Sequence, residues 1–226
     1  LALYGPKGLG EVWAALRVLM GPLPYPVCPE VLDAPAALCE RFGGWPQGAK
    51  LTPVPTRHRV TSQGYRLDLP RAGRFSPEKA RALGVPVRQW KMLQHGGSVA
   101  LEGGSIVEPQ AVLGPARQGL SFVFSGDTAP CPALEKGASG ADPLLCDATY
   151  ALPEQAAQAK QYGHSTFGQS AALAARAGAK RLWLVHYSPM ITDPEEELAQ
   201  AQSLFPAAEC GYDGKSITLQ YEEDEA

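Results

Sequence analysis

Among its 226 residues the chain has only four histidines and five cysteines, two of the residue types from which metal and catalytic sites are commonly built. The cysteines form no C-x-x-C pair, and their odd number and irregular spacing argue against a disulfide framework or a structural zinc cluster. This usage indicates a reducing compartment, and we expect a cytoplasmic protein. No apolar run is long enough to span a membrane, so we expect no membrane partner.

What the chain does have is enough apolar residues for a core, since 45% of its residues are hydrophobic. Alternating apolar runs and helical segments between residues 120 and 186 predict an α/β layered fold. We expect strands over 52–60, 64–69, 120–124, 144–147, 181–186 and 217–221. We expect helices over 8–20, 36–41, 153–161 and 165–178, the last of them capped by Thr166 and Gln169.

The net charge of −3 hides an asymmetry along the chain. Residues 57–91 contain nine Lys or Arg and two acids, whereas the chain from Met92 onward contains seven Lys or Arg and seventeen acids. Residues 70–97 are basic, contain Trp90 and lack a long apolar period, which favours a projecting arm that contacts a polyanion. The alternative is an ordinary surface loop with Trp90 buried. The acidic run 222–225 is expected to be a solvated tail.

Three of the four histidines stand at strand ends or helix starts. His186 follows the apolar run 181–185, and His58 and Asp127 follow earlier apolar runs, where side chains of α/β sheets point into the active-site crevice. Zinc accepts imidazole nitrogen and carboxylate oxygen, and two metals can share one carboxylate. We therefore interpret Asp127 as a bridge, with His58 and His186 each serving one metal. The alternative is that each histidine is a hydrogen-bonded structural residue.

The third histidine, His164, precedes a predicted helix N-terminus, where backbone N–H groups favour an anion such as phosphate. Asp147, at the end of the run 144–146, could hydrogen-bond this imidazole. The pair would then act as a general acid toward a leaving oxygen. The alternative is that Asp147 and Thr149 cap local turns and His164 caps the helix.

Taken in order, these motifs resemble the ribonuclease Z family, the tRNA 3′-processing endoribonucleases of the metallo-β-lactamase superfamily. The match extends over nearly the whole chain. It comprises Leu3-Tyr4-Gly5-Pro6-Lys7-Gly8-Leu9, His58 with Gly64-Tyr65-Arg66-Leu67, Gly114-Pro115-Ala116-Arg117-Gln118-Gly119, Ser125-Gly126-Asp127-Thr128, Asp147-Ala148-Thr149, Gly163-His164-Ser165-Thr166 and His186-Tyr187-Ser188-Pro189.

The resemblance implies one domain over residues 1–226 with an αββα four-layer sandwich, into which residues 70–97 are inserted as an RNA-gripping exosite, the basic arm. It implies two zinc ions, with manganese as the other candidate, held in part by His58, Asp127 and His186. His164, supported by Asp147, would assist the leaving group. The implied partners are precursor tRNA and a second subunit in a homodimer. The side chains of the basic arm that would contact RNA are Arg74, Lys79, Arg81, Arg88 and Lys91.

The chain departs from the family pattern in three places. The His-x-His-x-Asp-His motif is absent, and because the chain begins inside an apolar run we expect it upstream of Leu1. Cys146-Asp147-Ala148-Thr149 stands where the family has His-Glu-Ala-Thr, so the acid is one methylene shorter. The basic arm has Gly84-Val85-Pro86-Val87-Arg88-Gln89 where many members have Gly-x-Pro-x-Gly-Pro.

The leading hypothesis is a zinc-dependent endonuclease that removes the 3′ trailer of precursor tRNA, although we expect these residues alone to be inactive and to bind fewer than two zinc ions. A second hypothesis keeps the fold and changes the substrate, to another phosphodiester or to RNA degraded from its end. A third is a catalytically incomplete fragment or a binding subunit.

Overall fold

The structure is a computed structural model that describes residues 1–38 and 44–222. The chain divides into two compact units. The first contains Leu1–Ala36, Lys50–Leu67 and Ser121–Leu219, and the second contains Ala37–Ala49, Asp68–Leu120 and Gln220–Ala226. None of the helices in the described part is long and apolar enough to cross a membrane.

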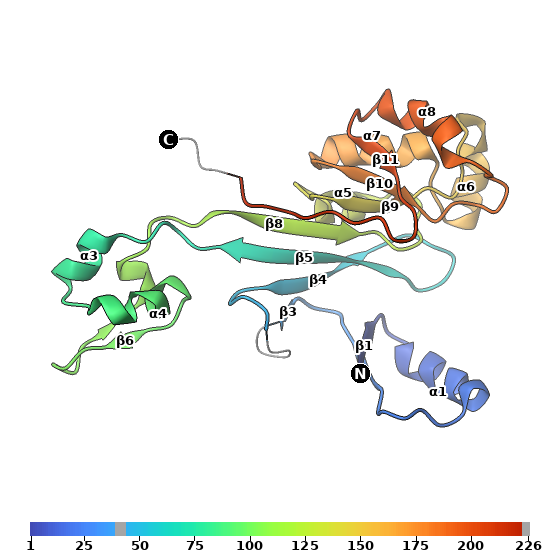
Figure 1. The fold of residues 1–226 in the computed structure, drawn as a ribbon. Helices are drawn as coiled ribbons and strands as arrows, with labels where there is room; N and C mark the ends of the chain where they lie inside the picture. The colour runs from blue at the N-terminus through green and yellow to red at the C-terminus, as the bar shows by residue number, and fades with distance from the viewer. Residues whose placement is uncertain (39–43, 223–226) are drawn as a thin grey trace. The chain divides into compact units, whose positions relative to one another are not determined.

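A seven-stranded sheet has the order β11-β10-β9-β8-β5-β4-β3 (Figure 1). Its strands are β3 (Ala36–Ala37), β4 (Lys50–Pro55), β5 (Gln63–Arg71), β8 (Arg117–Phe124), β9 (Leu144–Asp147), β10 (Leu182–Val185) and β11 (Ala208–Cys210). Strands β8 to β11 pair in parallel, so their carboxyl ends lie along one edge. The boundary between the two units falls within β3, β5 and β8. The strands expected over 64–69, 120–124, 144–147 and 181–186 are confirmed.

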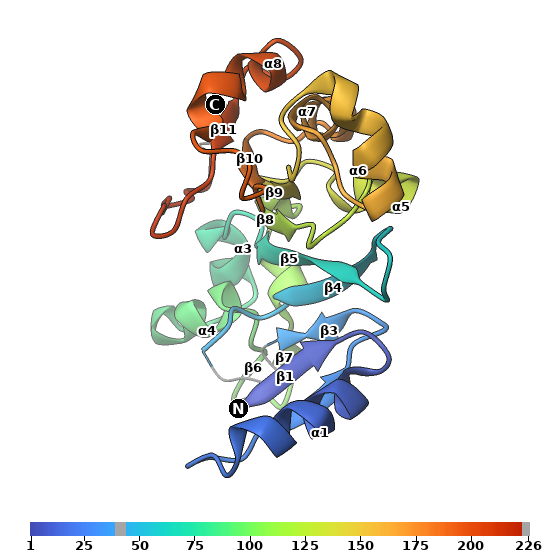
Figure 2. The same cartoon turned by 90° about the vertical axis from the view of Figure 1, so that its right-hand side faces the viewer.

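Four helices of the first unit gather around β9, β10 and β11 (Figures 1 and 2). They are α5 (Pro132–Gly137), α6 (Ala156–Tyr162), α7 (Phe167–Ala177) and α8 (Leu198–Gln202), with 3-10 turns at η3 (Pro153–Gln155) and η4 (Pro194–Glu197). Helix α7 packs against β9 and β10 through Phe167 and a row of small residues, and Leu144, Leu182 and Leu184 complete this core. The predicted α/β class is confirmed.

The boundaries of α7 follow directly from its sequence. The Thr166 hydroxyl accepts from the Gln169 N–H, and the Gln169 side chain accepts from the Thr166 N–H, so the predicted capping box is confirmed. The helix ends at Gly178, whose φ of 63° is the left-handed conformation that glycine adopts at low cost. The Thr166 capping box at the other end holds the preceding segment, which contains His164, at the start of the helix.

The amino-terminal part of the first unit contains two parallel strands, β1 (Ala2–Gly5) and β2 (Cys28–Val31), joined through helix α1 (Leu9–Met20). The helix expected over 8–20 is confirmed, and Gly21 ends it. None of the α1 residues is buried.

The second unit has its own apolar core, formed by Ala80, Val85, Leu93, Val99, Val107 and Val112. Its elements are α3 (Pro77–Ala82), η1 (Val87–Gln89), α4 (Trp90–Gln94), η2 (Pro109–Ala111) and the antiparallel pair β6 (Val99–Ala100) and β7 (Ile106–Val107). Trp90 is half-buried against this core, donates its indole N–H to the Val85 carbonyl at 2.9 Å and packs on Phe75. Trp90 is therefore one of the residues that stabilise this unit.

One local prediction is wrong, and another is displaced at its start. Residues 217–221 form no strand. Ala36–Ala37 is a strand, and the helix expected near 36–41 starts after it, at Leu38, while residues 39–41 lie outside the described residues. Both segments are short, and pairing with distant residues decides their conformation more than local propensity does. Most of the acidic run 222–225 also lies outside the described residues.

Candidate metal and proton-transfer site

Three of the candidate site residues lie at or just beyond the carboxyl ends of three parallel strands, along one edge of the sheet. Asp127 lies three residues beyond β8, Asp147 is the last residue of β9, and His186 directly follows β10. Val185 and Asp147 are register partners, so His186 emerges next to Asp147. The structure thus places these three side chains at the crevice edge expected for an α/β sheet.

His58 and His164 reach the same place from loops. An isolated bridge between Arg57 and Ala129 fixes the segment that contains His58, and His164 lies between the end of α6 and the Thr166 cap. The His164 ring centroid lies 4.8 Å from that of His58 and 5.2 Å from that of His186. All five predicted residues of the metal and acid–base site therefore form one cluster, called here the five-residue cluster: His58, Asp127, Asp147, His164 and His186.

Asp147 is fully buried, and five donors point at its carboxylate. They are the backbone N–H groups of Thr128 (2.9 Å), Thr149 (3.0 Å) and Ser165 (3.3 Å), the Thr149 hydroxyl (2.9 Å) and His164 Nδ1 (2.7 Å). A carboxylate offers about four lone-pair sites, so none remains for a metal. By distance alone Asp147 could join His164 and His186 in a metal site, since their ligand atoms lie within 4.8 Å of one another. Its hydrogen bonds instead indicate that Asp147 orients histidine side chains, His164 directly and His186 through Thr149.

The shorter acid still reaches its partner, because the 2.7 Å contact to His164 Nδ1 is a short, charge-assisted hydrogen bond. The buried hydroxyls of Ser125 and Ser170 fix the Asp147 backbone: Ser125 Oγ accepts from its N–H and Ser170 Oγ donates to its carbonyl. The Thr149 N–H bond to Asp147 is also a local turn contact, of the kind that the capping alternative expects.

Each of the three clustered histidines has a hydrogen-bond acceptor at Nδ1. The acceptors are the Gly163 carbonyl for His58 (3.0 Å), the Asp147 carboxylate for His164 (2.7 Å) and the Thr149 hydroxyl for His186 (2.8 Å). Carbonyl and carboxylate oxygens cannot donate, so the proton lies on Nδ1 in His58 and His164. In a neutral ring Nε2 is then left with a lone pair, which is how ligating histidines are commonly oriented.

The contact between His186 and Asp127 has the dimensions of a ligand pair. His186 Nε2 lies 3.4 Å from Asp127 Oδ2, which is longer than an ordinary hydrogen bond. Two ligands each about 2.0–2.1 Å from one tetrahedral ion would be about 3.4 Å apart. The two side chains are 46% and 44% exposed, so an ion and water can reach them. The nitrogen and oxygen donors present here therefore fit a zinc-type metal.

The backbone at His186 adopts a conformation that side chains other than glycine rarely take. Its φ is 66°, the only positive value at a non-glycine position in the described part of the chain. This conformation costs about 1–2 kcal/mol for an L-residue with a side chain. Backbone outliers of this kind gather at functional sites, and here the turn aims the imidazole toward Asp127.

A thiol must lose its proton to bind a metal. The buried thiols of Cys146 and Cys210 hold their protons too tightly to do so at neutral pH. Burial raises the pKa of Cys146 to about 12 and that of Cys210 to about 11. Burial also raises the pKa of Tyr187 well above its usual value. These groups stay neutral near pH 7 and pack as part of the core.

Thr149, Gly163 and Ser125 are contacts of the cluster to which sequence reasoning assigned no supporting role. The sequence alone gives Thr149 a turn-capping role and a place in a motif, and it gives Gly163 and Ser125 only places in motifs. The available signal was their proximity in sequence to Asp147, His164 and Asp127, but a neighbour in sequence does not show which atom it faces.

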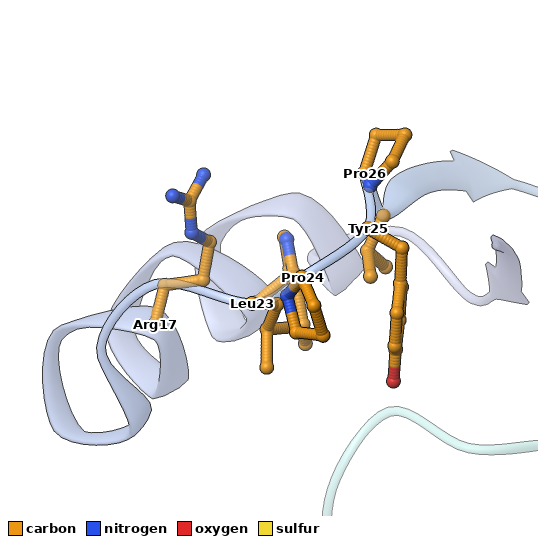
Figure 3. A pocket seen from close by; sticks show the side chains of 7 residues that line it. Arg17, Leu23, Pro24, Tyr25 and Pro26 are labelled. Atoms are coloured by element: carbon orange, nitrogen blue, oxygen red, sulfur yellow. The ribbon is translucent and has the colours of Figure 1, made fainter.

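The described part of the first unit has at least two hollows. One, of about 330 Å³, is lined by Trp13, Arg17 and residues 23–27, and Figure 3 shows Arg17 and Tyr25 at its wall. None of its lining residues belongs to the five-residue cluster. The other, of about 450 Å³, reaches the cluster through Thr149, and its charged lining residues are Asp193, Glu196 and Glu197. Its acidic charge makes it unsuited to a phosphate.

The five basic residues predicted to contact RNA belong to the second unit, and all five are exposed. Arg81 lies over the Trp90 ring at 5.3 Å, a cation–π contact that fixes its direction. Arg88 lies in η1 and Lys91 in α4. The predicted boundaries of the basic arm remain a prediction, since the second unit extends beyond them on both sides.

Comparison with known proteins identifies relatives of the whole chain. A family model described as a beta-lactamase superfamily domain matches residues 73–187. Ribonuclease Z of Agathobacter rectalis is 37% identical over 225 residues, which are 99% of this chain and 72% of that protein. Ribonuclease Z of Lachnoclostridium phytofermentans is 35% identical over 226 residues, 100% of this chain and 72% of the relative.

Solved structures show the same fold. Human tRNase Z, short form, aligns with a TM-score of 0.55 at 18% identity over 97% of this chain and 68% of that one. The metallo-β-lactamase fold protein YhfI from Bacillus subtilis aligns with a TM-score of 0.54 at 16% identity, over 93% and 61%. The predicted metallo-β-lactamase fold is confirmed.

Proposed function

The chain belongs to the ribonuclease Z family of the metallo-β-lactamase superfamily, and from that membership we propose that it is a metal-dependent endoribonuclease that removes the 3′ trailer of precursor tRNA. The proposal includes zinc as the metal, with manganese as the other candidate. It also includes a homodimer and a cytoplasmic location, the latter supported by the cysteine usage.

The observation that supports this proposal most is the orientation of three imidazoles beside a carboxylate. His58 and His164 have their Nδ1 atoms held by acceptors, and His186 lies 3.4 Å from Asp127. We assign His58, Asp127 and His186 as residues that hold metal. A bound metal would supply a hydroxide nucleophile at neutral pH and neutralise phosphate charge.

His164 has a different role in this proposal. Its Nδ1 proton is held by the buried Asp147, which limits rotation of the ring, and the ring lies beside the rings of His58 and His186. When Nε2 also has a proton, it can donate that proton to the leaving oxygen as the phosphorus–oxygen bond breaks. Asp147 stabilises the charged ring by accepting its Nδ1 hydrogen bond.

The second unit would supply binding affinity. Its exposed Arg and Lys side chains suit contacts to the phosphate backbone, which give affinity without reading sequence. Recognition of tRNA by its shape is consistent with this arrangement.

The experiment compares Asp127→Ala with His164→Ala in the complete protein. Asp127→Ala should lose both metal and cleavage of precursor tRNA. His164→Ala should retain metal and slow cleavage by roughly 10²–10⁴, the usual size of an acid–base contribution. On bis(p-nitrophenyl) phosphate, whose leaving group needs no proton, the His164→Ala defect should be much smaller.

Loss of metal in His164→Ala would move His164 into the ligand set. Equal defects on both substrates would exclude its role as a general acid. Efficient cleavage of the small diester with no cleavage of precursor tRNA would favour the second hypothesis, another phosphodiesterase of the same fold. Metal binding without any hydrolysis would favour a binding subunit.

A further inference from the structure

The Thr149 hydroxyl joins the buried acid of the site to a candidate metal ligand. Thr149 Oγ1 lies 2.9 Å from Asp147 Oδ1 and 2.8 Å from His186 Nδ1. A hydroxyl has one proton to donate, and the Asp147 carboxylate can only accept. The Thr149 proton is therefore directed to Asp147, and Thr149 Oγ1 must accept its second hydrogen bond from His186.

This direction determines the tautomer of His186. A proton on Nδ1 leaves Nε2 with its lone pair, and Nε2 is the atom that faces Asp127 at 3.4 Å. The opposite tautomer would set a lone pair of Nδ1 against a lone pair of Thr149 Oγ1, and its Nε2–H could not bind an ion. We propose that Thr149 is a positioning residue that holds His186 in the Nδ1–H tautomer and so prepares Nε2 as a metal ligand.

The part of this inference that concerns metal binding rests on the proposed function. The part that concerns the tautomer of His186 does not. Asp147 accepts directly from His164 and, through Thr149, orients His186. One buried carboxylate thus orients both the candidate acid and a candidate ligand. Removal of the Thr149 hydroxyl should disturb only His186, because His164 contacts Asp147 without it.

A purely structural role for Thr149 predicts a different outcome. The Thr149 backbone N–H also donates to Asp147 at 3.0 Å, and Thr128 and Ser165 donate from the backbone as well. Asp147 therefore keeps hydrogen-bond partners, and the local turn persists, when only the hydroxyl is removed. Thr149→Val, which keeps the shape of the side chain, separates the two roles.

The test uses Thr149→Val, Thr149→Ser and, as a matched control, Thr192→Val at an exposed position. Imidazole ¹⁵N NMR of the metal-free proteins reports the tautomer of His186, and competition with a chelator reports the affinity for zinc or manganese alone. The wild type and Thr149→Ser should show Nδ1–H. Thr149→Val should populate Nε2–H and bind metal roughly 10–100-fold more weakly, as expected when a contact that orients a ligand is lost.

An Nε2–H tautomer of His186 in the wild type would overturn the proposal, as would unchanged metal affinity in a folded Thr149→Val. If Thr149→Val does not fold, the tautomers of the wild type and of Thr149→Ser still decide the matter. If the tautomers and affinities behave as expected and precursor tRNA is not cleaved, the proposed function fails while the role of Thr149 stands.

Discussion

His58 Nδ1 lies 3.0 Å from the carbonyl oxygen of Gly163, a residue 105 positions further along the chain. A methyl group on Gly163 would lie 2.9 Å from both the Cα and the Nδ1 of His58, which is too close for a real contact. Gly163 also has a φ of 79° and ends α6. The position of this histidine therefore depends on the absence of a side chain at Gly163.

Gly163→Ala should lower both stability and metal affinity. Gly178→Ala is the matched control, because Gly178 also ends a helix in the left-handed conformation but has open space where a Cβ would lie. Each substitution should cost about 1–2 kcal/mol of unfolding free energy for the backbone strain. Only Gly163→Ala should also displace His58 and weaken zinc binding, measured by chelator competition. Equal affinities in the two variants would separate His58 from the metal site.

Substitutions at His186 should reveal the strain at its φ of 66°. An L-residue with a side chain pays about 1–2 kcal/mol in this region whereas glycine does not, although glycine loses more chain entropy on folding. We expect His186→Gly to be at least as stable toward denaturant as His186→Ala. At His164, which has no positive φ, glycine should be less stable than alanine. The same order at both positions would contradict a strained turn.

Replacement of Arg88 and Lys91 by alanine should weaken tRNA binding and reduce its dependence on salt, because each phosphate contact releases a counterion. Both residues are exposed in the second unit, so the fold should be unaffected. The measurement is the dissociation constant at several salt concentrations. Lys136→Ala and Lys160→Ala, at basic positions of the first unit, together provide the control. An unchanged salt slope in the double variant would argue against an RNA-binding role.

The buried thiol of Cys146 should make the free energy of unfolding depend on pH in the alkaline range. Burial raises the pKa of its thiol from 9.0 to about 12 in the folded protein. Between these values the unfolded chain releases this proton and the folded chain keeps it, so rising pH favours unfolding. The stabilisation that comes from the protonated thiol is fully present below about pH 9. It is lost as the pH rises from there toward about 12, at up to about 1.4 kcal/mol per pH unit.

Denaturant unfolding of the wild type and of Cys146→Ala from pH 7 to 10.5 checks this prediction. The stability of the variant should fall less steeply above pH 9. Cys28→Ala, at an exposed thiol, should follow the wild type. Parallel curves for the wild type and Cys146→Ala would mean that the thiol proton is not held by burial.

Much of the site could be placed from sequence because its signals are local. The apolar runs that end at Asp147 and His186 predict two strands, and Thr166 with Gln169 predicts a capped helix, all three of which the structure has. Patterns of this kind depend on residues within a few positions of one another. The second unit has weaker local signals, because its core residues are spread over positions 80–112 with no helical or strand period.

The sequence by itself determined the family, the α/β class and the strand-end positions of Asp127, Asp147 and His186, since periodicity and motif order are properties of neighbouring residues. Only the tertiary structure decided which nitrogen of His58, His164 and His186 is held by a hydrogen bond, namely Nδ1 in each. Those hydrogen bonds join residues 17, 37 and 105 positions apart. Which nitrogen an acceptor faces depends on strand register and loop conformation, so no local pattern encodes it.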